Sequence, residues 1–111
     1  MNKEFRIKKN KEIETLLSQN KKVGNSQFSV YYVNRPDAAH FRFAVSVGKK
    51  YGTAVERNRI KRQIREIVNR AEIGVLVDFF VIVKPSAKKL KFESVKQTLT
   101  NLFARAKIIE G

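Results

Sequence analysis

A run of cationic side chains between residues 49 and 65 is the strongest chemical feature of this sequence. Seven of these seventeen positions are lysine or arginine, and a single acid, Glu56, interrupts them. Arginine carries a planar fork of N–H donors that suits two-point contact with phosphate and stacking on bases. These residues are therefore suited to bind anions, and a backbone of repeated phosphate groups is the natural ligand.

Side chains for nucleophilic, acid–base or metal-dependent chemistry are sparse. The chain has no cysteine and one histidine, His40. The acids, including Glu12 and Asp78, show no paired spacing of the kind that a metal-dependent nuclease requires. We therefore expect no catalytic residue and no metal site in the protein itself.

The net charge is far from that of an average globular protein. Lysine and arginine number 24 against ten acids, which gives a formal net charge of +14 and an isoelectric point near 10.4. Such self-repulsion destabilises the compact state unless an anionic partner compensates it. The longest apolar run, residues 79–83, is far too short to span a bilayer. These features favour nucleic acid over a membrane surface as the partner.

The size of the chain, 111 residues with 42% hydrophobic side chains, predicts one domain over residues 1–111. Residues 1–9 carry four basic side chains and are interpreted as a flexible basic arm. The charged amino terminus has no apolar signal core, and cysteine is absent, so we expect a cytoplasmic protein.

The basic run must be positioned by a helix over residues 54–71. Thr53 is a suitable N-cap, and Glu56 stands where a capping box needs an acid to reach back to the cap. Apolar residues at helical spacing define the buried side of this helix: Ile60, Ile64, Ile67, Val68 and Ala71. The opposite side carries Asn58, Arg59, Lys61, Arg62 and Arg65, while Arg57 falls at the boundary.

A solvated helix face is the simplest alternative for such a charge run. A solvated face normally mixes charges of opposite sign four residues apart, because such pairs stabilise the helix. Here Arg57, Lys61 and Arg65 place like charges at that spacing. The pattern therefore favours a surface that binds a polyanion.

The remaining elements follow from hydrophobic periodicity and turn residues. A first helix is expected over residues 10–20 with Asn10 as its N-cap, and alternating strands over 27–34 and 41–47. A buried strand over 78–84 and a helix over 92–108 complete the chain. The order helix–strand–strand–helix–strand–helix predicts an α/β (α+β) two-layer sandwich with a central sheet.

One face of the sheet is expected to remain open. In the strand over 41–47, Arg42 and Ser46 alternate with strongly apolar residues, so their face is mixed. Tyr31 lies on the mixed set of the strand over 27–34. This face is a candidate site for a ligand.

The segment 46–66 resembles the signature of the protein subunit of bacterial ribonuclease P. The sequence Arg57-Asn58-Arg59-Ile60-Lys61-Arg62-Gln63-Ile64-Arg65 carries the specific part, and Lys49-Lys50-Tyr51-Gly52 precedes it in register. The similarity continues through residues 5–10, Gln27-Phe28 and Lys84-Pro85, and so covers nearly the whole chain.

The resemblance implies a ribonucleoprotein that removes the 5′ leader of precursor tRNA, with Mg²⁺ held mainly by a catalytic RNA subunit. It implies a central mixed sheet and a left-handed crossover, against the usual right-handed preference. It places the following residues against the catalytic RNA: Arg57, Asn58, Arg59, Lys61, Arg62 and Arg65. Lys49 and Lys50 come just before the helix and are expected to bind RNA with them. It places Ile13, Leu17 and Tyr31 in a cleft for the leader.

Some positions depart from the family pattern. Ile13 and Leu17 occupy positions that are commonly aromatic, so apolar contact replaces base stacking there. Ser26 stands where arginine is usual, and Thr53 replaces a common asparagine with another good helix cap. For Tyr31 two interpretations stand side by side: the ring stacks on a base, or it packs under the first helix.

Three other classes of protein remain as alternatives. A ribosomal-type structural RNA-binding protein can use a related sandwich, and a DNA-binding protein can place a basic helix in the major groove. The absence of a short helix–turn–helix pair argues against DNA binding. The absence of an acid–histidine constellation argues against a nuclease that works without RNA.

Overall fold

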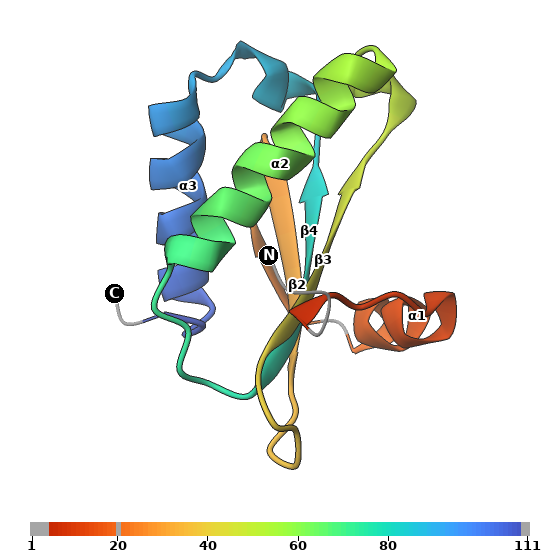
Figure 1. Ribbon diagram of the computed structural model, residues 1–111, viewed down its shortest axis with the longest axis vertical. Helices are drawn as coiled ribbons and strands as arrows, with labels where there is room; N and C mark the ends of the chain where they lie inside the picture. The colour runs from red at the N-terminus through yellow and green to blue at the C-terminus, as the bar shows by residue number, and fades with distance from the viewer. Residues whose placement is uncertain (1–4, 20, 110–111) are drawn as a thin grey trace.

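A four-stranded mixed sheet organises the computed structural model, which describes residues 5–19 and 21–109. The strands lie in the order β1-β2-β4-β3, and the α-helices of the described residues pack around them (Figure 1). The strands are β1 (Lys22–Gly24), β2 (Phe28–Asn34), β3 (Arg42–Val47) and β4 (Val77–Val83). The helices are α1 (Asn10–Ser18), α2 (Ala54–Arg70) and α3 (Phe92–Arg105), with short 3-10 helices η2 (Lys49–Tyr51) and η3 (Pro85–Lys89).

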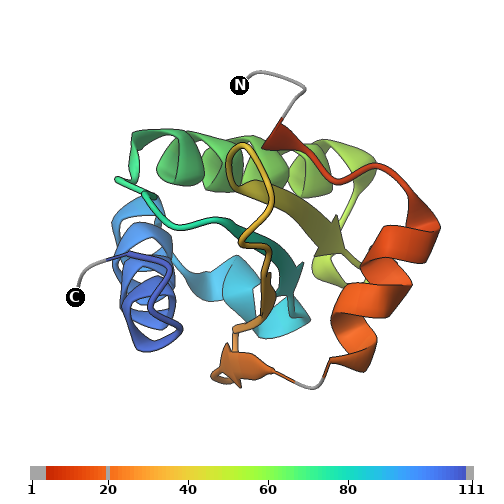
Figure 2. The ribbon, with the colours of Figure 1, turned by 90° about the horizontal axis from the view of Figure 1, so that it is seen from below.

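The two faces of the sheet are covered by different helices, as the view along the strands shows (Figure 2). The face under α2 and α3 carries the main core, in which Phe28, Phe79 and Leu99 are fully buried. The face under α1 carries a smaller cluster around Leu16 and Phe80. The strict alternation of side chains along the strands produces this division.

The crossover connection from β3 through α2 to β4 has a handedness that is rare in proteins. The two strands are parallel neighbours, and α2 links them. With both strands pointing up and α2 in front of the sheet, β4 lies to the left of β3 (Figure 1). The crossover is therefore left-handed, as the family resemblance implied and against the general preference.

The predicted order of elements is confirmed except for β1, which the sequence did not indicate. β1 has three residues, one of them Gly24, and so offers no hydrophobic alternation to detect. The first helix also differs, since Lys9 rather than Asn10 occupies the N-cap and makes no side-chain cap bond. The last helix ends at Arg105, three residues before the predicted end.

The amino-terminal segment differs from the expected flexible arm. Ile7 donates its backbone N–H to the Phe43 carbonyl at 2.9 Å, and its side chain is 5% exposed. The Phe5 ring lies 4.3 Å from that of His40, measured between centroids. Residues 5–7 are thus packed on the edge of β3, while residues 1–4 lie outside the described part of the chain.

Candidate nucleic-acid interface

The capping box predicted for α2 is present and fixes where the helix begins. The Thr53 hydroxyl accepts from the Glu56 N–H at 3.2 Å, and the Glu56 carboxylate accepts from the Thr53 N–H at 2.9 Å. These bonds, with the ammonium of Lys88 at 3.0 Å, lower the pKa of Glu56 to about 2. The one acid within the basic run is therefore committed to the helix start and to Lys88.

The apolar stripe of α2 faces the sheet as predicted. Ile60, Ile64, Ile67 and Val68 are buried in the main core. On the other side, Asn58, Arg59 and Arg62 are exposed to solvent. The burial of the stripe against the sheet thus fixes which residues of α2 can meet a partner.

Three cations lie on the flank of α2 rather than on its outer side. Arg57, Lys61 and Arg65 are half-buried, which confirms the boundary position of Arg57. Lys61 and Arg65 were predicted on the side opposite the apolar stripe, and they lie closer to the boundary instead. Burial first, and then the nearby Arg6 guanidinium, lower the pKa of Arg65. This flank therefore faces the edge of β3, where Arg6 forms a β-bridge with Phe43.

Lys49 and Lys50 extend the basic side beyond the helix. Both are exposed on η2, which Tyr51 anchors with a buried ring. Burial is the main cause that raises the pKa of the Tyr51 phenol. We call the eight predicted residues of α2 and η2 the basic surface: Lys49, Lys50, Arg57, Asn58, Arg59, Lys61, Arg62 and Arg65.

The cations of the basic surface have no acidic partners within residues 5–19 and 21–109. The ion pairs found there join other residues, such as Arg70 with Glu66 and Lys88 with Glu56. Like charges concentrated in this way favour an anionic ligand over bare solvent. Arg6 lies beside this surface. This position was not predicted, because residues 1–9 were interpreted as a flexible basic arm.

The residues predicted for the leader cleft do come together. Ile13 and Leu17 of α1 and Tyr31 of β2 are half-buried and pack on the same cluster, around Leu16 and Phe80. We call Ile13, Leu17 and Tyr31 the α1 cluster. The Tyr31 ring therefore lies among the apolar contacts of α1 and still keeps part of its surface exposed.

A further cation stands beside Tyr31. The ammonium of Lys22 lies 5.7 Å from the centroid of the Tyr31 ring, within the range of a cation–π contact. The pairing of β1 with β2 places these two residues opposite each other. Sequence reasoning missed Lys22 because β1 itself was missed.

The prediction that Arg42 remains open for a ligand is wrong. Its guanidinium donates to both Asp78 oxygens, at 3.1 and 2.7 Å, and to the Glu12 carboxylate at 2.8 Å. The hydrogen bonds that Arg42 donates to these acids raise the pKa of Arg42, and the bond to Glu12 lowers the pKa of Glu12. Ser46, at the other end of the same face, is exposed as expected.

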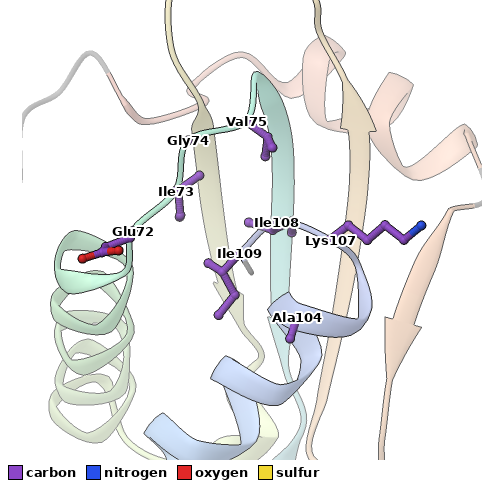
Figure 3. Close-up of a pocket in the computed structure, with 8 residues that line it drawn as sticks. All are labelled: Glu72, Ile73, Gly74, Val75, Ala104, Lys107, Ile108 and Ile109. Atoms are coloured by element: carbon purple, nitrogen blue, oxygen red, sulfur yellow. The ribbon is translucent and has the colours of Figure 1, made fainter. Parts of the chain in front are cut away.

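One cavity lies away from both groups of residues. It has a volume of about 930 Å³ and lies between the segment after α2 and the turn after α3, on the α2 and α3 side of the sheet. Figure 3 shows apolar side chains such as Ile73, Val75 and Ile109 around it. In the part of the chain that the structure describes, no three acidic or histidine side chains gather to hold a metal ion. Nor does any helix there have the length and hydropathy to cross a membrane.

The fold and the basic surface define a small nucleic-acid-binding protein of the α+β class. Residues 1–107 match the Ribonuclease P family. The ribonuclease P protein component of Enterococcus faecalis is 41% identical over 99% of this chain and 95% of its own length. That of Acholeplasma laidlawii is 36% identical over 99% and 96%. The chain therefore belongs to the family of the bacterial ribonuclease P protein component.

Solved structures show the same fold. The ribonuclease P protein of Staphylococcus aureus superposes with a TM-score of 0.87 at 37% identity, over 96% of this chain and 98% of its own. That of Thermotoga maritima gives 0.81 at 28% identity, with the same coverage. The chain is thus part of the enzyme complex that processes the 5′ ends of tRNA, and RNA is its partner in that complex. The alternative of a ribosomal-type structural protein is not favoured.

Proposed function

We propose that the basic surface anchors the protein to the catalytic RNA of ribonuclease P, while the α1 cluster meets the 5′ leader of precursor tRNA. The observation that carries the proposal is that the cations of the basic surface form no ion pair within the described residues. Their arrangement on a capped, well-buried helix presents several guanidinium groups at fixed positions. A phosphate backbone supplies the missing negative charge.

Binding of the RNA subunit is then driven mainly by electrostatics. Each phosphate that an arginine neutralises releases condensed counterions, so the logarithm of the affinity falls with the logarithm of the salt concentration. Exposed side chains such as Arg59 and Arg62 can reach phosphates without rearranging the core. Arg57 and Arg65, held by burial on the flank, lose less conformational freedom when they bind.

The α1 cluster suits a single strand of any sequence. The partly exposed Tyr31 ring can stack on a base, a contact worth roughly 1–3 kcal/mol per base. Lys22 beside the ring supplies positive charge for the backbone. Ile13 and Leu17 add apolar contact without base stacking, so the proposed leader site relies on one aromatic residue.

The chemical step is assigned to the RNA subunit, with Mg²⁺ held mainly by that RNA. No group of three acidic or histidine side chains in residues 5–19 and 21–109 fits a bound metal ion. The protein's own contribution is to reduce phosphate repulsion and to position the leader, which lowers the Mg²⁺ concentration that cleavage requires. We place this activity in the cytoplasm, where bacterial tRNA precursors are made.

Reconstitution tests the proposal. The protein is mixed with a bacterial ribonuclease P RNA at a Mg²⁺ concentration where the RNA alone is nearly inactive, and 5′ cleavage of precursor tRNA is measured. We expect cleavage only when both subunits are present. Cleavage by the protein alone, or no gain when the protein is added, would contradict the proposal.

A further inference from the structure

Four charged side chains join α1 to the far end of the sheet. Asp78 of β4 is 4% exposed and binds two arginines, with Arg35 at 2.9 Å and Arg42 at 2.7 Å. Arg42 also binds Glu12, in the first turn of α1, at 2.8 Å. We call this chain of ion pairs the α1 anchor.

The helix that the anchor holds has few other constraints. α1 contains nine residues and has no side-chain cap, and isolated helices of this length are marginal in water. Leu16 is its only buried side chain among those described, with Ile13 and Leu17 half-buried beside it. Apolar contacts of this kind are not directional, so they permit the helix to shift over the sheet. A charge-assisted hydrogen bond at one end defines its position.

The anchor lies on the same sheet face as the α1 cluster. Strand pairing places Val33, Asp78 and Arg42 in one row across the sheet, and Tyr31, Phe80 and Ala44 in another. The two rows are two residues apart along the strands, which is about 7 Å. A shift of α1 at Glu12 therefore changes the spacing between Leu17 and the Tyr31 ring.

We propose that Glu12 and Arg42 are positioning residues that hold α1 at the distance from the sheet at which the leader strand fits beside Tyr31. This inference rests on the proposed role of the α1 cluster in leader binding. Arg42 acts through α1 and does not contact the leader. Asp78, buried between two arginines, fixes the Arg42 guanidinium so that it can reach Glu12.

Two variants on one helix test the inference. Glu12→Gln breaks the ion pair with Arg42, whereas Glu14→Gln changes an exposed acid for which no ion pair is found among the described residues. Each adds one unit to the net charge of +14, and glutamine forms helix about as well as glutamate. General electrostatics therefore predicts slightly tighter RNA binding for both variants.

The readout is the affinity of the holoenzyme for precursor tRNA relative to mature tRNA. We expect Glu12→Gln to lose roughly three- to tenfold in this ratio, as for a partly exposed charged hydrogen bond, and Glu14→Gln to lose nothing. The affinity of Glu12→Gln for the RNA subunit should not fall. Equal ratios for the two variants would overturn the inference.

A distance measurement separates positioning from unfolding of α1. Because the chain has no cysteine, spin labels can be placed at Ser18→Cys on α1 and Thr100→Cys on α3. We expect the distance distribution between them to broaden in Glu12→Gln while circular dichroism shows helix content unchanged. An unchanged distribution would contradict the proposal.

Tyr31→Ala distinguishes failure of this inference from failure of the proposed function. If Tyr31→Ala lowers the affinity ratio and Glu12→Gln does not, the leader site stands and the anchor has no positioning role. If neither variant lowers the ratio, the leader does not bind the α1 cluster.

Discussion

Replacing Arg62 by alanine removes an exposed guanidinium from the middle of the basic surface. The side chain makes no ion pair with any described residue, so the change should alter the free energy of unfolding by no more than about 0.5 kcal/mol. The loss of one phosphate contact should flatten the slope of log affinity against log salt by about 0.9. At about 0.15 M salt, that slope corresponds to roughly fivefold weaker binding of the RNA subunit.

The assay is a titration of the RNA subunit with protein at several salt concentrations. Arg105→Ala is a matched control, because Arg105 is also an exposed arginine but lies in the last turn of α3. We expect the control to leave the slope nearly unchanged. The same slope for Arg62→Ala and the unmodified protein would refute the assignment of α2 to the RNA interface.

Three further outcomes are expected. Tyr31→Ala should weaken binding of precursor tRNA by roughly 1–3 kcal/mol in competition assays and leave mature tRNA unaffected; equal losses would argue against the leader site. The pKa of Glu56, about 2 in the folded state, lies below its unfolded value, so its stabilising contribution is present above pH ~4.5 and disappears as the pH falls towards 2. Glu56→Gln should reduce this pH dependence in thermal melts, and an identical profile would show that ionisation of Glu56 does not stabilise the fold. Asp78→Ala leaves two arginines without their buried acid, and denaturant unfolding should show a loss of roughly 3 kcal/mol; a loss below about 1 kcal/mol would contradict the buried ion pairs.

The parts of the fold that sequence could predict are those governed by local signals. The start of α2 is set by Thr53 and Glu56, three residues apart, and the structure shows both bonds of the capping box. Its buried stripe follows from a helical repeat of isoleucine and valine. These signals are local in the sequence. The start of α2 and its buried side could therefore be predicted without knowing the rest of the fold.

The parts that escaped prediction depend on residues distant in sequence. Asp78 and Arg42 are 36 positions apart and meet only because β3 and β4 are parallel neighbours. The sequence shows Arg42 as a polar residue on a mixed strand face. No pattern in the neighbouring residues distinguishes an arginine that pairs with a buried acid from one that is free to bind RNA. Arg6 was likewise assigned to a free arm, because one backbone bridge to Phe43 leaves no pattern in the sequence.

The left-handed crossover shows a different limit. Residue patterns give the order β3, α2, β4 but carry no signal for the hand of the connection, and the general preference points the other way. Family resemblance supplied that feature, together with the division of the surface between catalytic RNA and leader. The division itself remains a proposal.

Site-directed cleavage tests that division most directly. The chain has no cysteine, so a hydroxyl-radical-generating probe can be attached at single cysteines, Asn69→Cys and Ser46→Cys. Asn69 is exposed on α2, about two turns beyond Arg62, and Ser46 is exposed on the Tyr31 face of the sheet. The probe on α2 should cut the RNA subunit, and the probe at position 46 should cut the leader of bound precursor tRNA. Cleavage of the leader from α2, or of the RNA subunit alone from both positions, would contradict the account.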